Sequence, residues 1–195
     1  MFVLILILII LLSIIYINFR ENYENDNMIY IKSSVDTRKY WVRNLPDKEN
    51  SANTLAKIRE NIVKLVNYLK KNSDKFPKKL SYIKNLVKRT KIINIMETPK
   101  DDKFTSYTVN KGEKIVFCLR HKTINTIHDM NTLMYVVIHE LAHVGCPEHG
   151  HTPLFKKIFK FLLKQSVQIG IYIPVNYIKN PQNYCGMVIN EYLFK

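Results

Sequence analysis

Apolar residues dominate the start of the chain, and residues 2–19 contain no charged side chain. A helix of this length rises about 27 Å, which is close to the thickness of the hydrocarbon core of a bilayer. A cleaved signal peptide is disfavoured because no basic residue precedes the run and no small-residue cleavage site follows it. The pattern therefore predicts an uncleaved transmembrane anchor over residues 1–19.

Polar residues of mixed charge follow over residues 20–50, with a turn signal at Asn44–Asp47. This stretch is interpreted as a juxtamembrane stalk, which can pack on the domain. The first basic residues after the anchor are Arg20 and Lys32, whereas no Lys or Arg precedes it. By the positive-inside rule, this asymmetry predicts a single-pass membrane protein whose C-terminal part faces the cytosol or the interior of a virion. The folded domain is then expected over residues 51–195.

Helical periodicity begins at Ser51 and predicts an amphipathic helix that ends before Pro77. A second helical piece is expected over residues 80–87. The first helix has lysines on one side and apolar residues on the other. The apolar residues are Leu55, Ile58, Ile62, Leu65, Val66 and Leu69.

Two β-prone runs, 105–109 and 115–119, flank an Asn-x-Gly turn and predict a hairpin. A second amphipathic helix follows, capped by Asp129 or Asn131, and it is expected to end at Gly145–Pro147. A further helix is expected from Thr152 to about Gly170, because Thr-Pro supplies an N-cap and a proline at the first helical position. Residues 171–195 are expected to be loop-like.

The most specific chemical pattern is His139-Glu140-Leu141-Ala142-His143, an H-E-x-x-H sequence in the second amphipathic helix. Residues four apart lie on one face of a helix, so both imidazoles can reach one zinc ion. Glu140 can then act on a metal-bound water. The alternative is a helix with two unrelated histidines. The apolar setting counts against it, as does the clustering of four of the six histidines between 139 and 151.

A catalytic zinc site needs a third protein ligand and an open position for water. The helix break after His143 allows the chain to turn back and offer His149 or His151. His149 has the spacing of the H-E-x-x-H-x-x-G-x-x-H pattern, but Cys146 stands where that pattern has glycine. His151 lies directly before the next helix, which would hold it rigidly. Cys146 is interpreted as a packed or free cysteine, because a thiolate ligand would lower the Lewis acidity of the metal.

Charge and cysteine content add two expectations. The formal net charge of +14, from 30 Lys and Arg against 16 Asp and Glu, suits an anionic partner such as nucleic acid or lipid headgroups. Solvated helix faces explain it equally well, and no nucleic-acid motif accompanies the charge. Three cysteines at unrelated spacings (Cys118, Cys146 and Cys185) predict no disulfide framework and indicate a reducing compartment.

The motif and the residues after it resemble the WLM and SprT (Spartan)-like zinc metallopeptidases, above all the versions encoded by large eukaryotic DNA viruses. The similarity rests on residues 139–143 and 146–155, and it extends from about Tyr107 through Met187. Viral members keep Gly-His-Thr, here residues 150–152, but have no histidine at the position of His149. The resemblance therefore favours His151 as the third ligand, although the spacing departs from the yeast-type WLM pattern.

This resemblance implies an α+β, gluzincin-like zincin fold, with an active-site helix beside a small antiparallel sheet and a second helix after the ligand loop. It implies Zn²⁺ bound by His139, His143 and His151, with Glu140 as the general base. An edge strand of the hairpin could pair with an extended peptide.

Four further residues have less specific interpretations. Tyr184 is a candidate oxyanion donor, with packing as the alternative. Met187 invites comparison with the Met-turn of metzincins, with hydrophobic filling as the default. His121 and His128 are interpreted as surface residues.

The leading hypothesis is thus a membrane-anchored zinc metallopeptidase that acts on DNA-associated or virion proteins. A second hypothesis is a structural membrane or virion protein whose metalloprotease-like domain only binds a partner. Retention of Glu140 disfavours it, because a scaffold has no need for a general base. A third is a nucleic-acid-binding protein in which zinc only holds the fold. Structural zinc sites are usually closed and rich in cysteine, which a three-histidine set is not.

Overall fold

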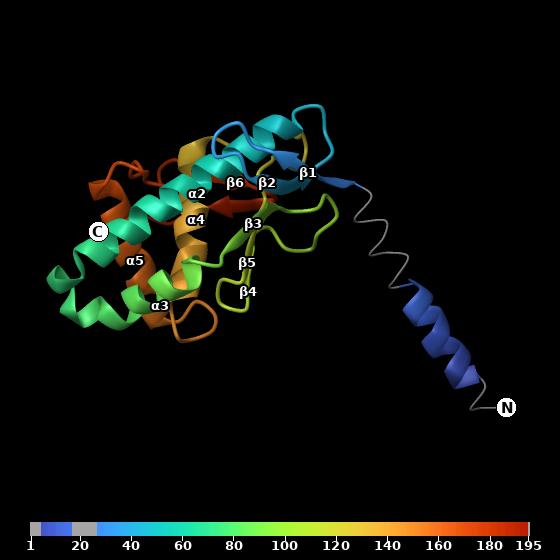
Figure 1. The fold of residues 1–195 in the computed structure, drawn as a ribbon, viewed down its shortest axis with the longest axis horizontal. Coiled ribbons are helices and arrows are strands. Elements are labelled where there is room, and N and C mark those ends of the chain that lie inside the picture. Colours follow the sequence, from blue (N-terminus) through green and yellow to red (C-terminus); the bar gives the residue numbers. More distant parts are fainter. Residues whose placement is uncertain (1–4, 17–26, 195) are drawn as a thin grey trace.

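The computed structural model describes residues 5–16 and 27–194 (Figure 1). Among these residues, no helix is long and apolar enough to cross a membrane. The predicted transmembrane helix is therefore wrong, and so is the predicted single-pass membrane localisation. Residues 5–16 are helical, which corresponds to a rise of about 18 Å against a bilayer core of about 30 Å. Residues 1–4 and 17–19 of that prediction lie outside the described residues.

An antiparallel hairpin opens the body, where β1 (Met28–Lys32) pairs with β2 (Lys39–Arg43). Side chains alternate between the two faces of a strand, and the inward Tyr40 and Val42 are buried. Both belong to the same core cluster as the apolar residues of α2 (Lys48–Lys71). This hairpin lies in the stretch that is interpreted as a stalk, and it packs on α2 and β3.

The two predicted helices after Ser51 are present. Apolar residues recur with the helical period, so α2 buries Leu55, Ile58 and Ile62 along one stripe. Pro77 separates the helices as expected, since it begins a short 3-10 turn in place of a continuing helix. The elements of this part are η1 (Ser73–Lys75), η2 (Pro77–Lys79) and α3 (Leu80–Thr90).

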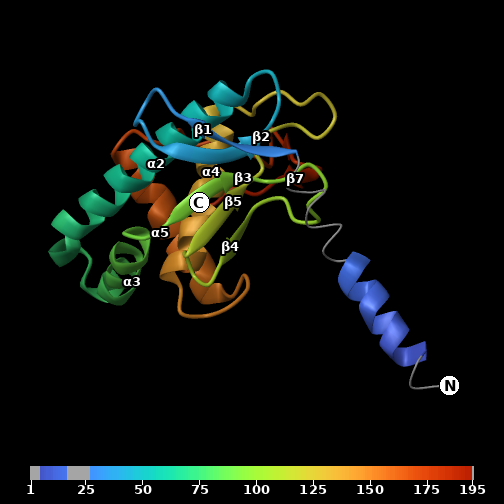
Figure 2. The ribbon, with the colours of Figure 1, turned by 45° about the vertical axis from the view of Figure 1, so that its right-hand side comes forward.

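A three-stranded sheet has the order β3-β5-β4, from β3 (Asn94–Glu97), β5 (Lys114–Phe117) and β4 (Tyr107–Val109) (Figure 2). The predicted β4–β5 hairpin is confirmed as an antiparallel pair. The expectation of an antiparallel sheet is wrong for its third strand, because β3 pairs with β5 in parallel. Figure 2 shows the β1–β2 hairpin continuing beside this sheet, consistent with the packing of β2 on β3. The strand β4 lies at the edge.

Two helices and a short hairpin complete the body: α4 (Met130–Gly145), α5 (Pro153–Gln168), β6 (Gln182–Tyr184) and β7 (Met187–Ile189). The tail was expected to be loop-like, but β6 and β7 pair around a turn in which Cys185 and Gly186 both have positive φ. Turns with positive φ values usually contain Asn or Gly at these positions, so a cysteine at 185 does not indicate a hairpin in the sequence.

A disulfide joins Cys118, directly after β5, to Cys185 in the β6–β7 turn. The expectation that the cysteines form no disulfide is therefore wrong. The two residues are 67 positions apart, and only the fold brings them together. Cys146 is buried and unpaired, which confirms the interpretation of a packed cysteine.

Candidate metal centre

The helix α4 presents the H-E-x-x-H residues. Asp129 is the N-cap and accepts a hydrogen bond from the backbone N–H of Thr132 at 2.9 Å, which satisfies an otherwise unpaired donor of the first turn. Nearly every other side chain of α4 is buried, so its register is fixed by the core. His139 and His143 therefore project side by side from one face, with ring centroids 5.1 Å apart.

His151 approaches this pair from the loop between α4 and α5. Its Nε2 lies 2.9 Å from Nε2 of His139 and 3.2 Å from Nε2 of His143. Thr152 caps α5 immediately afterwards, accepting from the backbone N–H of Phe155 at 3.2 Å. The start of α5 thus fixes the position of His151.

These three histidines form the only group of three or more potential metal ligands within the described residues 5–16 and 27–194. Their candidate ligand atoms lie within 4.8 Å of one another. His149 also faces the cleft but does not join this group.

Aromatic side chains surround the histidines. Phe155 stacks on His143 with centroids 4.2 Å apart and meets His139 edge-on at 4.9 Å. Burial, and to a smaller extent the neighbouring His143 and His151, lower the pKa of His139 to about 3. Burial also lowers the pKa of His143 to about 4, with contributions from His151 and Lys111. Both imidazoles are therefore neutral near pH 7, and a neutral imidazole can donate a lone pair to a metal.

Glu140 is buried beside His139, with 5% of its surface exposed. Its Oε2 accepts a hydrogen bond from Oγ1 of Thr108 at 2.7 Å. Burial raises the pKa of Glu140 to about 7, while the bond from Thr108 opposes this shift. Thr108 was not identified from the sequence, because its contact with Glu140 arises only when β4 packs against α4.

A cleft of about 650 Å³ contains the histidines and Glu140. One wall is the edge strand β4 and the segment before it, and another is the β6–β7 hairpin with residues 190–191. The loop residues 149–151 close a third side. A polar centre within a partly apolar cleft is typical of a site that binds a ligand in a fixed orientation.

Tyr184 lies in this cleft but is 1% exposed. Its hydroxyl donates to the carbonyl oxygen of Cys118 at 2.8 Å and contacts Oγ of Ser106 at 2.7 Å. Because that proton is used by a buried carbonyl, the packing interpretation of Tyr184 describes this structure better than a free oxyanion donor. Met187 is 50% exposed in the cleft wall, so it does not fill the core as expected.

His128 was expected at the surface, and this is wrong because only 5% of it is exposed. It packs between His121 and Tyr184, with centroid distances of 3.7 and 5.0 Å, and its Nε2 lies 3.6 Å from Sγ of Cys185. Burial lowers its pKa to about 4. Neither His121 nor His128 joins the histidine group of the cleft.

Proteins of two viruses resemble this chain, one of them over most of its length. Protein R325 of Acanthamoeba polyphaga mimivirus is 46% identical over 166 residues, which cover 85% of this chain and 84% of that protein. Protein 136R of Invertebrate iridescent virus 6 is 38% identical over 96 residues, which cover 48% and 49% of the two chains. The relatives thus come from large DNA viruses, as the sequence resemblance implied.

A crystal structure of a Wss1 mutant from Saccharomyces cerevisiae has a TM-score of 0.50 and 24% identity, covering 66% of this chain and 86% of that chain. This likeness shows a common fold. The family model of the WLM domain matches residues 34–171, which begins earlier and ends earlier than the resemblance read from the sequence. The match includes the β2 strand, α4, α5 and all three histidines of the cleft. The chain therefore belongs to the WLM domain family and is a metallopeptidase-like protein.

Proposed function

We propose that this protein is a zinc-dependent peptidase in which His139, His143 and His151 bind the metal and Glu140 is the general base. The observation that carries the proposal is the convergence of three imidazole Nε2 atoms beside a buried carboxylate in an open cleft.

The arrangement of the three histidines fits coordination of one zinc ion better than it fits hydrogen bonds among the imidazoles. A neutral Nε2 atom offers either one hydrogen or one lone pair, so His151 cannot form good hydrogen bonds to both of its neighbours. Two nitrogen ligands of a tetrahedral zinc ion, each about 2.0–2.1 Å from the metal, lie about 3.3 Å apart. The Nε2 separations of 2.9 and 3.2 Å are close to this value. Three histidine ligands also leave a fourth position open on a tetrahedral metal.

The choice of His151 over His149 is supported by the same distances. His151 reaches both helix histidines, whereas His149 is exposed in the cleft wall and belongs to no described ligand group. The next helix also restrains His151 through the cap at Thr152.

Bound zinc would lower the pKa of a water molecule and polarise the scissile carbonyl. Glu140 would accept the proton of the attacking water and return it to the leaving nitrogen. Thr108 holds Oε2 of this carboxylate, so Oε1 is the proton acceptor in this proposal. The burial that raises the pKa of Glu140 suits a group that must both take and give a proton near neutral pH.

The substrate of a peptidase-like domain is a protein, and the cleft suits an extended segment of it. The strand β4 lies at the edge of the sheet, and Tyr107 and Thr108 of this strand line the cleft. An extended peptide can add to the edge strand of a sheet through its backbone. DNA-associated or virion proteins as the substrate class stay a prediction.

Replacing Glu140 with Gln tests the catalytic role. The amide keeps the size of the side chain but cannot accept the proton. We expect the zinc content to stay near that of the wild type while cleavage of an unfolded protein substrate falls at least about a hundredfold. Equal cleavage by Glu140→Gln and the wild type would exclude this role.

Replacing single histidines with Ala tests the ligand set. Zinc bound per chain, measured after dialysis against a weak chelator, should fall in His151→Ala and stay unchanged in His149→Ala. The reverse result would assign the third ligand to His149. Zinc retention by both variants would contradict the three-histidine site.

A further inference from the structure

The ammonium group of Lys111 binds the loop that carries the third histidine. Lys111 lies in the β4–β5 turn, and its Nζ donates to three successive carbonyl oxygens between His143 and His151. The acceptors are the oxygens of Cys146 (3.1 Å), Pro147 (3.5 Å) and Glu148. One side chain thus ties the edge of the sheet to the segment between two of the proposed ligands.

The backbone of this turn is strained where Lys111 stands. Asn110 and Lys111 have φ values of 47° and 56°, in a region that costs a residue with a side chain about 1 kcal/mol or more. Gly112 follows with φ of 113°, and a Cβ atom there would lie 3.0 Å from Cγ1 of Val144. The turn is therefore pressed against the last turn of α4, which brings the ammonium group of Lys111 over the loop.

The same loop is fixed at its other end. The carboxylate of Glu148 accepts a hydrogen bond from Oγ1 of Thr152, the residue that caps α5. On the helix side, Arg89 donates to the carbonyl of Val144. Residues 149–151 therefore span a short distance between two anchored points. Lys111 is the anchor that comes from the sheet.

We propose that Lys111 is a positioning residue that orders residues 146–151, so that His151 meets His139 and His143 before the metal binds. The inference rests on the proposed function for the role of the three histidines. A loop that is ordered in advance loses less conformational entropy when its histidine binds the metal, which raises the affinity.

The positive charge of Lys111, taken alone, predicts the opposite effect on zinc affinity. A positive ammonium group in the wall of the cleft repels a divalent cation, so removing it would tighten zinc binding if repulsion dominated. The direction of the change in zinc affinity therefore separates positioning from electrostatics.

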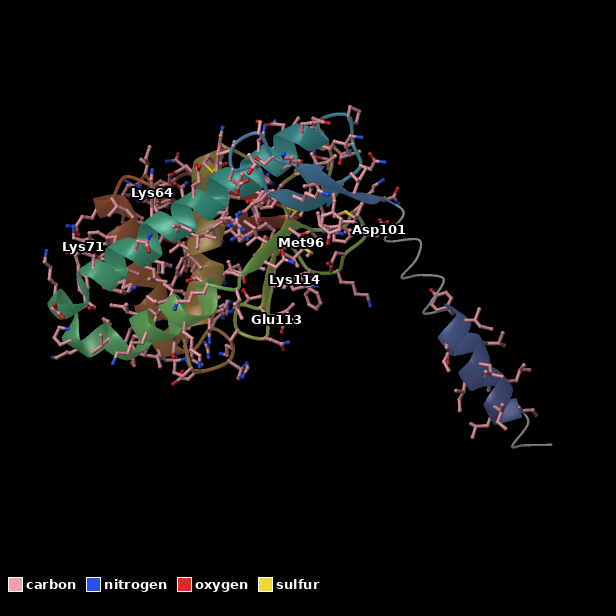
Figure 3. The ribbon with its side chains drawn as sticks, in the orientation of Figure 1. Lys64, Lys71, Met96, Asp101, Glu113 and Lys114 are labelled. Carbon is pink, nitrogen blue, oxygen red and sulfur yellow. A yellow bond between two sulfur atoms is a disulfide. The ribbon has the colours of Figure 1, made fainter. Side chains whose placement is uncertain are left out.

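The test uses the full chain and compares the wild type with Lys111→Met, Lys111→Arg and Lys64→Met. Methionine has a Cβ atom and so leaves the backbone cost of the turn unchanged. Lys64 lies exposed on α2 and serves as the control for a lost positive charge (Figure 3). Zinc affinity is measured by competition with a chromophoric chelator, and cobalt absorption reports the geometry of the site. Melting of the metal-free proteins shows whether each variant is folded.

We expect Lys111→Met to weaken zinc binding about tenfold or more and to change the cobalt spectrum, because supporting residues of metal sites typically contribute that much. Lys111→Arg should recover most of the affinity, and Lys64→Met should match the wild type. Unchanged or tighter zinc binding by a folded Lys111→Met would overturn the inference, as would an equal loss in Lys64→Met. A wild type that binds no zinc would instead contradict the proposed function.

Discussion

At the scale of single residues, the hydrogen bond from Thr108 to Glu140 controls the proposed base. Replacing Thr108 with Val removes the donor and keeps the shape of the side chain. The bond lowers the pKa of Glu140, so its loss raises that pKa, and a smaller fraction of the carboxylate is ionised at a given pH. As the pH is lowered, Thr108→Val should therefore lose the activity that needs the ionised carboxylate at a higher pH than the wild type does.

We expect the acidic limb of the kcat/KM profile of Thr108→Val to move upward by about one pH unit, because a hydrogen bond to a charged group contributes about 1.5–3 kcal/mol. The measurement is a profile from pH 5 to 9 at saturating zinc. Thr123→Val, an exposed threonine outside the cleft, is the control and should keep the wild-type profile. A profile of Thr108→Val that coincides with the wild type would show that Thr108 does not tune Glu140.

The residues of the cleft differ in how well the sequence reveals them. His139, Glu140 and His143 follow from their spacing on one helix, which needs no tertiary information. The meeting of His151 with them depends on how the loop after α4 folds back, and the sequence alone left His149 as an alternative. Thr108 contacts α4 and Lys111 contacts the loop after it, and a periodic pattern contains no signal for such tertiary contacts.

At the scale of elements, a buried ion pair joins the sheet to α2. Glu97 ends β3, and its Oε1 accepts from Nε of Arg120 at 2.8 Å, with both side chains buried. Arg120 also donates to Ser51 of α2 and to Asp47, the residue that precedes this helix. These bonds join β3 and α2 to the segment that follows β5.

Replacing Glu97 with Gln removes the buried counter-charge of Arg120 and leaves only the half-exposed carboxylate of Asp47 beside its guanidinium. Breaking one side of a buried pair costs about 3–5 kcal/mol, so we expect the free energy of unfolding to fall by about 3 kcal/mol in urea titrations. Glu113→Gln, at an exposed residue in the β4–β5 turn, should change it by less than about 0.5 kcal/mol (Figure 3). A loss for Glu97→Gln no larger than that of the control would mean that the pair does not stabilise the fold.

The elements that the sequence predicts are those with strong local patterns. The stripes of α2 and α3, the caps of α4 and α5, and the Asn-x-Gly turn between β4 and β5 are all local. The strands of the β1–β2 hairpin are too short to give a clear local pattern. Tyr40 and Val42 are buried only because they pack in one core with the apolar residues of α2. The parallel pairing of β3 with β5 likewise follows from contacts that are distant in sequence.

At the scale of the whole molecule, the excess of positive charge is partly internal. Arg120 and Arg43 bind buried acceptors around Glu97 and Thr98, while Arg89 and Lys111 bind carbonyl groups at the end of α4. These cations stabilise the framework of the cleft and do not form a surface for an anionic partner. A net charge of +14 therefore overstates the charge that is free to attract nucleic acid or lipid.

The disulfide Cys118–Cys185 acts on the molecule as a whole, because the loop that it closes contains α4, α5 and the three histidines of the cleft. It also fixes the β6–β7 hairpin, whose residues 187–189 form a cleft wall. Closing a loop of 67 residues restricts the unfolded chain and is worth about 4 kcal/mol in the chain-entropy description. Reduction should therefore affect both the stability of the domain and its substrate binding.

We expect a reductant to lower the unfolding free energy of the wild type by about 4 kcal/mol, and to raise KM more than it lowers kcat, because the freed hairpin holds Met187 and Val188 less firmly. The double variant Cys118→Ala/Cys185→Ala is the control. Without reductant it should resemble the reduced wild type, and added reductant should not change it further. If reduction left both the melting temperature and KM of the wild type unchanged, the bond would have no part in holding the cleft. A fall in kcat alone would place its effect on the catalytic residues and not on the cleft wall.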